Sequence, residues 1–219
     1  MKTKKRGEQC VLILLASVWA LVCLFPLWVL FSGTFSLDTN NLTRTFFPNS
    51  LANGISKCKE ALLTVEIAAS TVHTLIYTSI TVIGILVISS LAAYEFTFYN
   101  FPLKKVLFGL LMASMMLPQV LYIIPLYRLV FSMNLADTFA GISFPMMVSA
   151  LSVFIMMQFL EDLPLSFIES ARIDGAGHFQ IYRRIVLPLM RNGILTTVVL
   201  MFMKIWGQYL WPALVTGQK

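Results

Sequence analysis

The chain has 219 residues, of which 58% are hydrophobic and 12% are charged, and its formal net charge is +6. Its mean hydropathy of +0.81 lies far above the values of water-soluble globular proteins, which excludes that class. In lipid every backbone amide needs an internal partner, so apolar runs of about 20 residues indicate transmembrane helices. We therefore expect an all-α, polytopic membrane protein.

The first apolar run covers residues 10–31 and follows four basic residues: Lys2, Lys4, Lys5 and Arg6. A secretory signal shares the basic start, but its apolar core is only about 7 to 15 residues long. This run is longer and contains Trp19, Pro26 and Trp28. The pattern favours a retained membrane anchor, and we assign residues 1–33 to a cytoplasmic N-terminus and this first helix.

Four further apolar runs are each long enough to span a bilayer. They cover residues 71–94, 106–130, 141–160 and 193–215. The sequence thus predicts five transmembrane helices. We expect residues 34–70 to form an extracytoplasmic, solvated loop with a short helix over 57–69, and residues 71–219 to form the core domain.

Orientation follows from the basic residues, because Lys and Arg are retained on the cytoplasmic side. With the N-terminus inside, ten of them are cytoplasmic: Lys2, Lys4, Lys5, Arg6, Lys104, Lys105, Arg172, Arg183, Arg184 and Arg191. Five are outside: Arg44, Lys57, Lys59, Arg128 and Lys219. The positive net charge therefore reports topology and contact with membrane lipid, and we expect no binding to nucleic acid.

Prolines interrupt two of the predicted spans: Pro118 and Pro125 in the third, and Pro145 early in the fourth. Each proline lacks a backbone donor and frees a carbonyl, which is tolerated at membrane depth only beside other helices or a polar cavity. One interpretation is static kinks for packing. The other is helices that bend around a transport pathway.

Lys204 is a formal charge far from the ends of a predicted span, whereas Arg128 lies two residues from the end of its span. Burying an ammonium there costs at least about 2.5 to 3.5 kcal/mol, so the side chain is expected to face protein or water. A functional role, shared with Gln208, is one hypothesis. The alternative is that Lys204 reaches the interface, where Trp206, Tyr209 and Trp211 form an aromatic belt.

Between the last two spans lies a charged, glycine-containing segment, residues 164–188. Pro164 ends the fourth span, and Ser166 with Glu169 has the spacing of a capping box, which predicts a short helix from Ser166. Its predicted apolar face contains Phe167, Ile168 and Ala171.

The rest of the segment predicts a tight turn and a second helix. The turn residues are Asp174, Gly175 and Gly177, which we expect to reverse the chain through positive φ. Apolar residues at helical spacing follow, and Pro188 is predicted to close the unit. The local sequence pattern alone favours neither of two interpretations, a hairpin lying on the membrane surface or a docking loop.

No cofactor site is predicted. The three cysteines (Cys10, Cys23 and Cys58) have no paired spacing, and His73 and His178 are isolated, so we expect no metal site. The spans lack the clustered acids, histidines or serine with a base that a membrane-embedded enzyme needs, so we assign no catalytic residue.

The 164–188 segment resembles the EAA loop of ABC importer permeases. The resemblance is carried by Glu169, Ser170, Ala171, Gly175, Ile185, Leu187 and Pro188, with Ser170 where the family usually has alanine. Four stretches are similar to the carbohydrate-uptake, maltose-type branch: 91–108, 116–141, 173–177 and 206–215. The 173–177 stretch adds Asp174, Ala176 and Gly177 to the loop.

This resemblance implies a type I importer permease fold in a bacterial inner membrane, with a function in carbohydrate import. It implies a second permease, two copies of a cytosolic ATPase that binds ATP and Mg²⁺, and an extracytoplasmic binding protein, with the loop as the coupling element. The family normally has six spans, so we expect that this chain lacks the last one. The alternative is a truncated, inactive or regulatory fragment.

The candidate residues of a substrate path are those whose amide, aromatic or charged groups could bind a sugar or sugar phosphate. They are Gln119, Lys204, Trp206, Gln208 and Tyr209. Gly207 and Gln208 replace the Asn and the acidic or polar residue that usually follow the first Trp of the family's 206–215 motif. A substrate role carried over from that motif is correspondingly weak.

Overall fold

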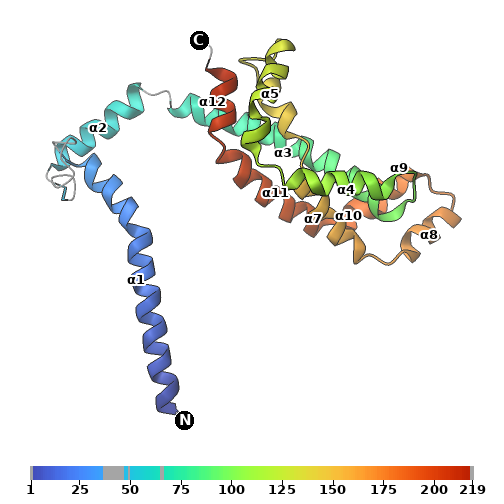
Figure 1. The fold of residues 1–219 in the computed structure, drawn as a ribbon, viewed down its shortest axis with the longest axis horizontal. Helices are drawn as coiled ribbons and strands as arrows, with labels where there is room; N and C mark the ends of the chain where they lie inside the picture. Colours follow the sequence, from blue (N-terminus) through green and yellow to red (C-terminus); the bar gives the residue numbers. More distant parts are fainter. Residues whose placement is uncertain (1, 37–46, 49, 65–66, 218–219) are drawn as a thin grey trace. The chain divides into compact units, whose positions relative to one another are not determined.

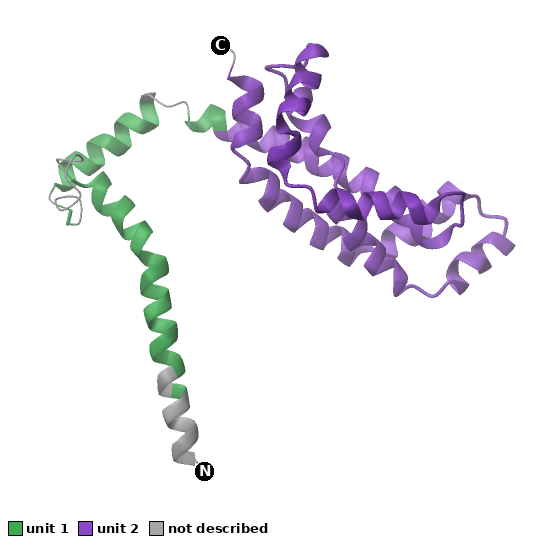
Figure 2. Cartoon of the chain, viewed as in Figure 1, with its two compact units in different colours: residues 1–70 green, residues 71–219 purple. Residues whose placement is uncertain are grey.

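The computed structural model describes residues 2–36, 47–48, 50–64 and 67–217. The chain divides into two compact units, Met1–Ser70 and Thr71–Lys219 (Figure 2). Every regular element in the described ranges is helical, which confirms the predicted all-α class.

The first unit contains α1 (Lys2–Thr34) and α2 (Leu51–Thr64), with Pro26 inside α1. Asn53 Nδ2 and Lys57 Nζ both donate to the carbonyl of Ser36, at 2.8 and 2.9 Å, and so tie α2 to the end of α1. The helix predicted over 57–69 therefore begins earlier, at Leu51. Other parts of the predicted 34–70 loop, at 37–46, 49 and 65–66, lie outside the described residues.

The elements that follow are short except for α3 (Figure 1). In chain order they are α3 (Ile67–Phe98), α4 (Lys104–Met115), α5 (Gln119–Ser132), α6 (Phe139–Ser143), the 3₁₀ helix η1 (Phe144–Met146), α7 (Ala150–Glu161), α8 (Ser166–Ile173), α9 (His178–Ile181), the π-helix η2 (Tyr182–Val186), α10 (Leu187–Leu189), α11 (Arg191–Trp206) and α12 (Leu210–Thr216).

Two helical segments, Leu12–Thr34 and Ile67–Phe98, are each long and apolar enough to cross a membrane. Three bent pairs raise the number to five if each pair is one span. The pairs are Lys104–Met115 with Gln119–Ser132, bent by 103°, Phe139–Met146 with Ala150–Glu161, bent by 48°, and His178–Leu189 with Arg191–Trp206, bent by 74°. The upper figure of five equals the sequence-based number, but the third pair includes residues 178–189, which the sequence analysis places in the segment before the last span.

Proline explains two of these breaks. Pro118 precedes α5 in an extended conformation (φ −60°, ψ 135°), and Pro145 lies in the 3₁₀ turn between α6 and α7. Pro125, in contrast, lies inside α5, which continues through it. The expectation of helices bent by proline is therefore met at Pro118 and Pro145 and not as a break at Pro125.

The run 193–215 does not form one helix as predicted. α11 ends at Trp206, with Gly207 as its C-cap, and α12 begins at Leu210. Pro212 lies in the first turn of α12, where backbone N–H groups have no intrahelical partner, so a proline is tolerated there and not one turn later. Gly207 and Pro212 together account for the break.

Two apolar cores lie along α3. One joins Tyr94 of α3 to Met156 of α7 and to Tyr182 of η2, and the other joins Ile85 of α3 to α5, α6, α11 and α12. α11 packs along α7, where a Cβ on Gly193 would lie only 2.9 Å from the ring of Phe159. The small residue thus lets two helices approach closely, as is common in membrane proteins.

Candidate functional site

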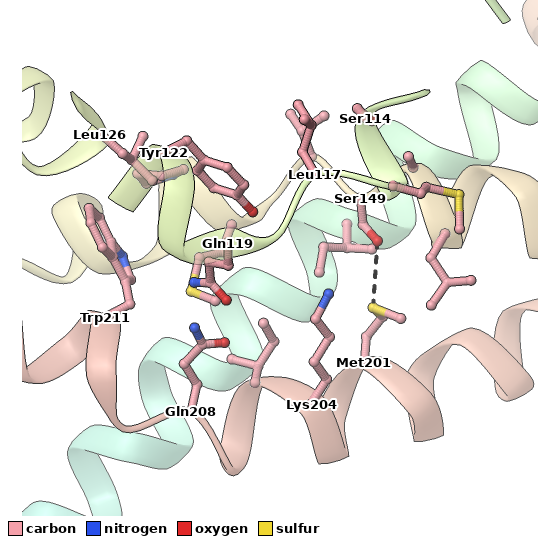
Figure 3. Close-up of a pocket in the computed structure, with 18 residues that line it drawn as sticks. Ser114, Leu117, Gln119, Tyr122, Leu126, Ser149, Met201, Lys204, Gln208 and Trp211 are labelled. Carbon is pink, nitrogen blue, oxygen red and sulfur yellow. Dashed lines mark hydrogen bonds between the residues drawn. The ribbon is translucent and has the colours of Figure 1, made fainter. Parts of the chain in front are cut away.

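An open cavity of about 630 Å³ lies beside the breaks between α4 and α5 and between η1 and α7, and beside the C-terminal end of α11 (Figure 3). Its wall is formed by α3, the ends of α4, the first half of α5, the start of α7, and α11 to α12. Most lining residues are apolar, for example Ile85, Leu126 and Ile205. A largely apolar hollow with a few polar groups is the usual form of a small-molecule site.

Three of the five predicted path residues line this cavity: Gln119, Lys204 and Gln208. Figure 3 shows their side chains turned into it from α5, from α11 and from the α11–α12 connection. Trp206 and Tyr209 are not among the lining residues. Trp206 stacks on Phe202 with ring centroids 5.5 Å apart, and Tyr209 is 81% exposed.

Sequence reasoning missed other cavity residues, notably Tyr122, Ser149 and Trp211. Tyr122 follows Gln119 by three residues, so both lie on one face of α5, and this spacing could have revealed it. Trp211 was also considered for aromatic stacking on a sugar, but it was not included among the predicted path residues, and its interpretation as part of an interfacial aromatic belt is wrong. Its side chain is fully buried, and Nε1–H donates to the carbonyl of Ile142 at 3.1 Å.

The cavity offers hydrogen bonding and one cation, and no metal chemistry. Within the described ranges, His, Cys, Asp and Glu side chains form no group of three that could hold a metal ion. Among the residues that line the cavity, Lys204 carries the single formal charge. The arrangement is therefore suited to binding a polar solute.

A helical hairpin, residues 166–190, forms the second candidate site. Its first arm, α8, begins at Ser166 as predicted, but the capping box is absent. Leu165 has helical φ and ψ (−54°, −28°), its carbonyl accepts from the N–H groups of Ile168 and Glu169, and no side chain caps the helix. Since Ser166 lies inside the first turn, its hydroxyl is not in the N-cap position, and the Glu169 carboxylate forms no capping contact.

The hairpin turn depends on Gly175. It has φ +81°, and an added Cβ would contact nothing within 4 Å, so glycine is required for conformation rather than for space. The Gly175 N–H donates to the carbonyl of Arg172 at 3.0 Å. Gly177 has φ −73°, so the prediction of positive φ there is wrong.

The second arm does not end at Pro188 as predicted. α10 continues to Leu189, and the chain breaks at Met190 (φ −87°, ψ 16°). A proline ring clashes with the carbonyl four residues before it, here in Arg184, and would break an α-helix. The preceding residues Tyr182–Val186 form a π-helix, whose wider turn removes this clash and carries the helix past Pro188.

The ten predicted loop residues fall into three groups by exposure. Glu169, Ser170, Asp174, Gly175, Gly177 and Pro188 are exposed; Ala176, Ile185 and Leu187 are half-buried; Ala171 is buried. Ala171 packs in the chain's own core with Ile168 and also lines a hollow of about 300 Å³ beside the turn. Phe167 was predicted on the buried face and is 52% exposed.

Tyr99, just after α3, holds the turn of the hairpin. Its ring stacks on His178 at 4.6 Å between centroids, and the Arg172 guanidinium lies 4.7 Å from its centroid. Its hydroxyl is 2.6 Å from that of Tyr94. Hydrogen bonding to Tyr99 raises the pKa of Arg172 above its ordinary value, so this cation stays charged at every physiological pH.

We expect Tyr99→Ala to loosen the hairpin. The change removes one cation–π contact, worth about 0.5–1 kcal/mol, and one aromatic pair, worth about 0.5–1.5 kcal/mol. Hydrogen exchange of the amides in residues 172–180 should then be about tenfold faster than in the unmodified chain. Tyr99→Phe retains both ring contacts and loses only the hydroxyl's hydrogen bonds to Tyr94 and Arg172, so it should accelerate exchange less than Tyr99→Ala. Equal exchange in the alanine variant and the unmodified chain would show that the stack is not an anchor.

The comparisons with known proteins agree with this architecture. The family described as binding-protein-dependent transport system inner membrane component matches residues 84–219, a range that contains the cavity and the hairpin. A crystal structure of a bacterial ABC transporter involved in the import of the acidic polysaccharide alginate has the same fold, with a TM-score of 0.80. It is 23% identical and covers 97% of this chain and 75% of that one.

Curated relatives are similar over nearly the whole chain. The sn-glycerol-3-phosphate transport system permease protein UgpE of Rhizobium meliloti (strain 1021) is 31% identical over 93% of this chain and 75% of its own length. The protein of the same name from Agrobacterium fabrum (strain C58) is 34% identical over 90% and 72%, respectively. The chain thus spans about three quarters of these relatives.

These matches confirm the resemblance drawn from the EAA-like segment. They identify the chain as a multi-pass inner-membrane transport component and not an enzyme. With its helical spans, cavity and hairpin, the chain belongs to the binding-protein-dependent transport system inner membrane component family, as a permease subunit of an ABC importer.

Proposed function

We propose that this permease carries a polyhydroxylated solute into the cell and that the 166–190 hairpin couples this movement to ATP hydrolysis. The solute class includes sugars, oligosaccharides, polyols and their phosphates. Support comes from the relatives, which are named for sn-glycerol 3-phosphate, and from the structural neighbour, which is described as importing alginate. All of these solutes are rich in hydroxyl groups, which the cavity's carboxamides can bind.

The observation that carries the coupling proposal is the exposed rim of the hairpin. Ile173 is 86% exposed, and Phe167 and Phe179 are exposed beside the acidic Glu169 and Asp174. Exposed apolar side chains that gather in one patch with a polar border mark a site of protein contact. The rim is adjacent to a hollow of about 300 Å³ lined by residues of the turn and of the second arm.

The base of the hairpin is packed in the protein core, whereas its rim is exposed. Ile168, Ala171, Ile181 and Tyr182 are buried in the core shared with α3 and α7, and the Tyr182 hydroxyl is 2.7 Å from Ser90 Oγ of α3. Because the hairpin cannot move without these helices, a push on the rim is passed to the transmembrane bundle. Such rigid-body linkage between two states is what ATP-driven coupling requires.

The proposal implies four partners. Two copies of a cytosolic ATPase bind ATP and Mg²⁺ and contact the hairpins, a second permease completes the path, and an extracytoplasmic protein delivers the solute. The hairpin and the N-terminus are then cytoplasmic, as the distribution of ten basic residues against five supports.

We expect Glu169→Lys to abolish the stimulation of ATP hydrolysis while the complex still assembles. The Glu169 carboxylate is exposed and interacts electrostatically with the exposed Arg172, so its reversal alters the charge of the rim and not the packed core. The measurement is ATPase activity of the reconstituted complex with its binding protein and solute, which should fall at least tenfold.

Asp162→Lys provides the control, since Asp162 is exposed at the C-cap of α7 outside the hairpin. It makes the same change of charge and should retain most of the stimulated rate. Equal activity in the Glu169→Lys variant and the unmodified complex would exclude Glu169 from the contact.

A further inference from the structure

The lining of the cavity contains a positive charge but no negative charge among the described residues. Lys204 lines it, and no aspartate or glutamate does so among the described residues. No described residue forms an ion pair or a hydrogen bond with the Lys204 ammonium. Lys204 lies 13 residues after Arg191, about 20 Å along the helix axis, and its side chain is exposed at the open cavity. A cation at such a depth is costly unless water or an anion accompanies it.

Neutral polar groups surround this cation. Figure 3 shows the carboxamides of Gln119 and Gln208 and the hydroxyl of Tyr122 directed into the same cavity. None of these three side chains has a hydrogen-bond partner among the described residues. Ser149 differs, because its hydroxyl caps α7 by accepting from the N–H of Ser152 at 3.3 Å and donates to Met201 Sδ at 3.7 Å.

We propose that Lys204 is the anion-binding residue of the solute path, so that the cavity passes polyhydroxylated solutes that carry a phosphate or a carboxylate. The ammonium pairs with the anionic group, and Gln119, Gln208 and Tyr122 exchange hydrogen bonds with the hydroxyls. The ammonium discriminates by charge because a neutral solute that occupies the cavity displaces water from it without supplying an anionic partner. This inference rests on the proposed transport function.

A purely structural role for Lys204 makes a different prediction. The residue lies in the last turn of α11, where a cation interacts favourably with the helix dipole. If that were its whole contribution, removing the charge would weaken the protein and slow the uptake of every solute equally. A solute-binding role instead changes the selectivity between charged and neutral solutes.

The test compares ATP-dependent uptake into proteoliposomes that contain the complete transporter with its binding protein. The probes are sn-glycerol 3-phosphate, galacturonate and neutral maltose, which separate phosphate, carboxylate and uncharged solutes. We expect the unmodified complex to accumulate an anionic probe. Lys204→Met should lower that uptake about tenfold or more, and Lys204→Arg should retain most of it.

Lys105→Met is the matched control, because Lys105 is exposed in the first turn of α4 and does not line the cavity. It should leave both uptake and basal ATPase activity unchanged. Preferred uptake of maltose, or equal loss with Met and Arg at 204, would overturn the anion proposal while leaving the transport function standing. No uptake of any probe and no stimulated ATPase would overturn both.

Discussion

Gly175→Pro is expected to reduce stimulated ATP hydrolysis to the basal rate. Gly175 has φ +81°, whereas proline is fixed near −65°, so the turn cannot form with proline in place. The substitution also removes the N–H that donates to Arg172. The two helical arms of the hairpin would then no longer be held in a fixed relative orientation. As a result, Glu169 and Ile173 would no longer lie on one continuous surface. The measurement is the ATPase rate of the assembled complex with and without solute-loaded binding protein.

Further variants distinguish the effect of the backbone conformation at Gly175 from the effect of replacing a glycine as such. Asn tolerates left-handed φ better than other residues, so Gly175→Asn should retain more stimulation than Gly175→Ala, and both more than Gly175→Pro. Gly177→Ala should be nearly neutral, because φ is −73° there and an added Cβ contacts nothing within 4 Å. Full stimulation with proline at 175 would contradict the assignment of this turn to coupling.

Trp211→Ala is expected to destabilise the bundle by about 3–5 kcal/mol, the usual cost of truncating a buried Trp. The Trp211 side chain is 0% exposed, joins α12 to α6 through the hydrogen bond to Ile142, and forms part of the cavity wall. The thermal unfolding midpoint of the purified protein should fall by several degrees, and the amount inserted in membranes should decrease.

The neighbouring Trp206 provides the comparison. It is 41% exposed and stacks only on Phe202, so Trp206→Ala should shift the midpoint much less. Trp211→Phe keeps most of the volume and leaves the Ile142 carbonyl unpaired, which costs about 1–3 kcal/mol and gives an intermediate shift. A larger effect at Trp206 than at Trp211 would contradict the packing described for α12.

The sequence predicts the fold class and the position of the hairpin because both depend on local or compositional signals. Apolar runs require helices in lipid, Pro118 lacks a donor, and Gly175 suits a left-handed turn. Family motifs added the architecture. These signals involve few residues each and need no knowledge of what packs against them.

Other features depend on contacts between distant segments and could not be read from the sequence. The cap at Ser166 fails because the chain turns helical one residue earlier, at Leu165, and Pro188 is accommodated by a π-helix. A small apolar residue such as Ala171 suits contact with a partner and burial in the protein's own core equally well. Only the packing against α3 and α7 shows that it is buried in the core.

Of the predicted path residues, likewise, some line the cavity and others do not. Lys204 was identified from the cost of a charge in lipid, and Gln119 and Gln208 from their hydrogen-bonding groups, and all three line it. Trp206 and Tyr209 carry equally suitable groups but do not line the cavity. Trp206 lies two residues after Lys204 and so on nearly the opposite side of α11, and Tyr209 follows the break at Gly207. A break in a span therefore limits predictions based on helical periodicity.

The most direct test of the coupling account is cross-linking from the hairpin rim to the ATPase in the assembled transporter. Ile173→Cys would be introduced after replacement of Cys10, Cys23 and Cys58 by serine, with Val148→Cys in the cavity wall as the control of similar exposure. The account predicts a thiol cross-link to the ATPase from position 173, with a yield that changes on ATP binding, and none from position 148. An assembled, ATP-hydrolysing complex with no cross-link from 173 would contradict it.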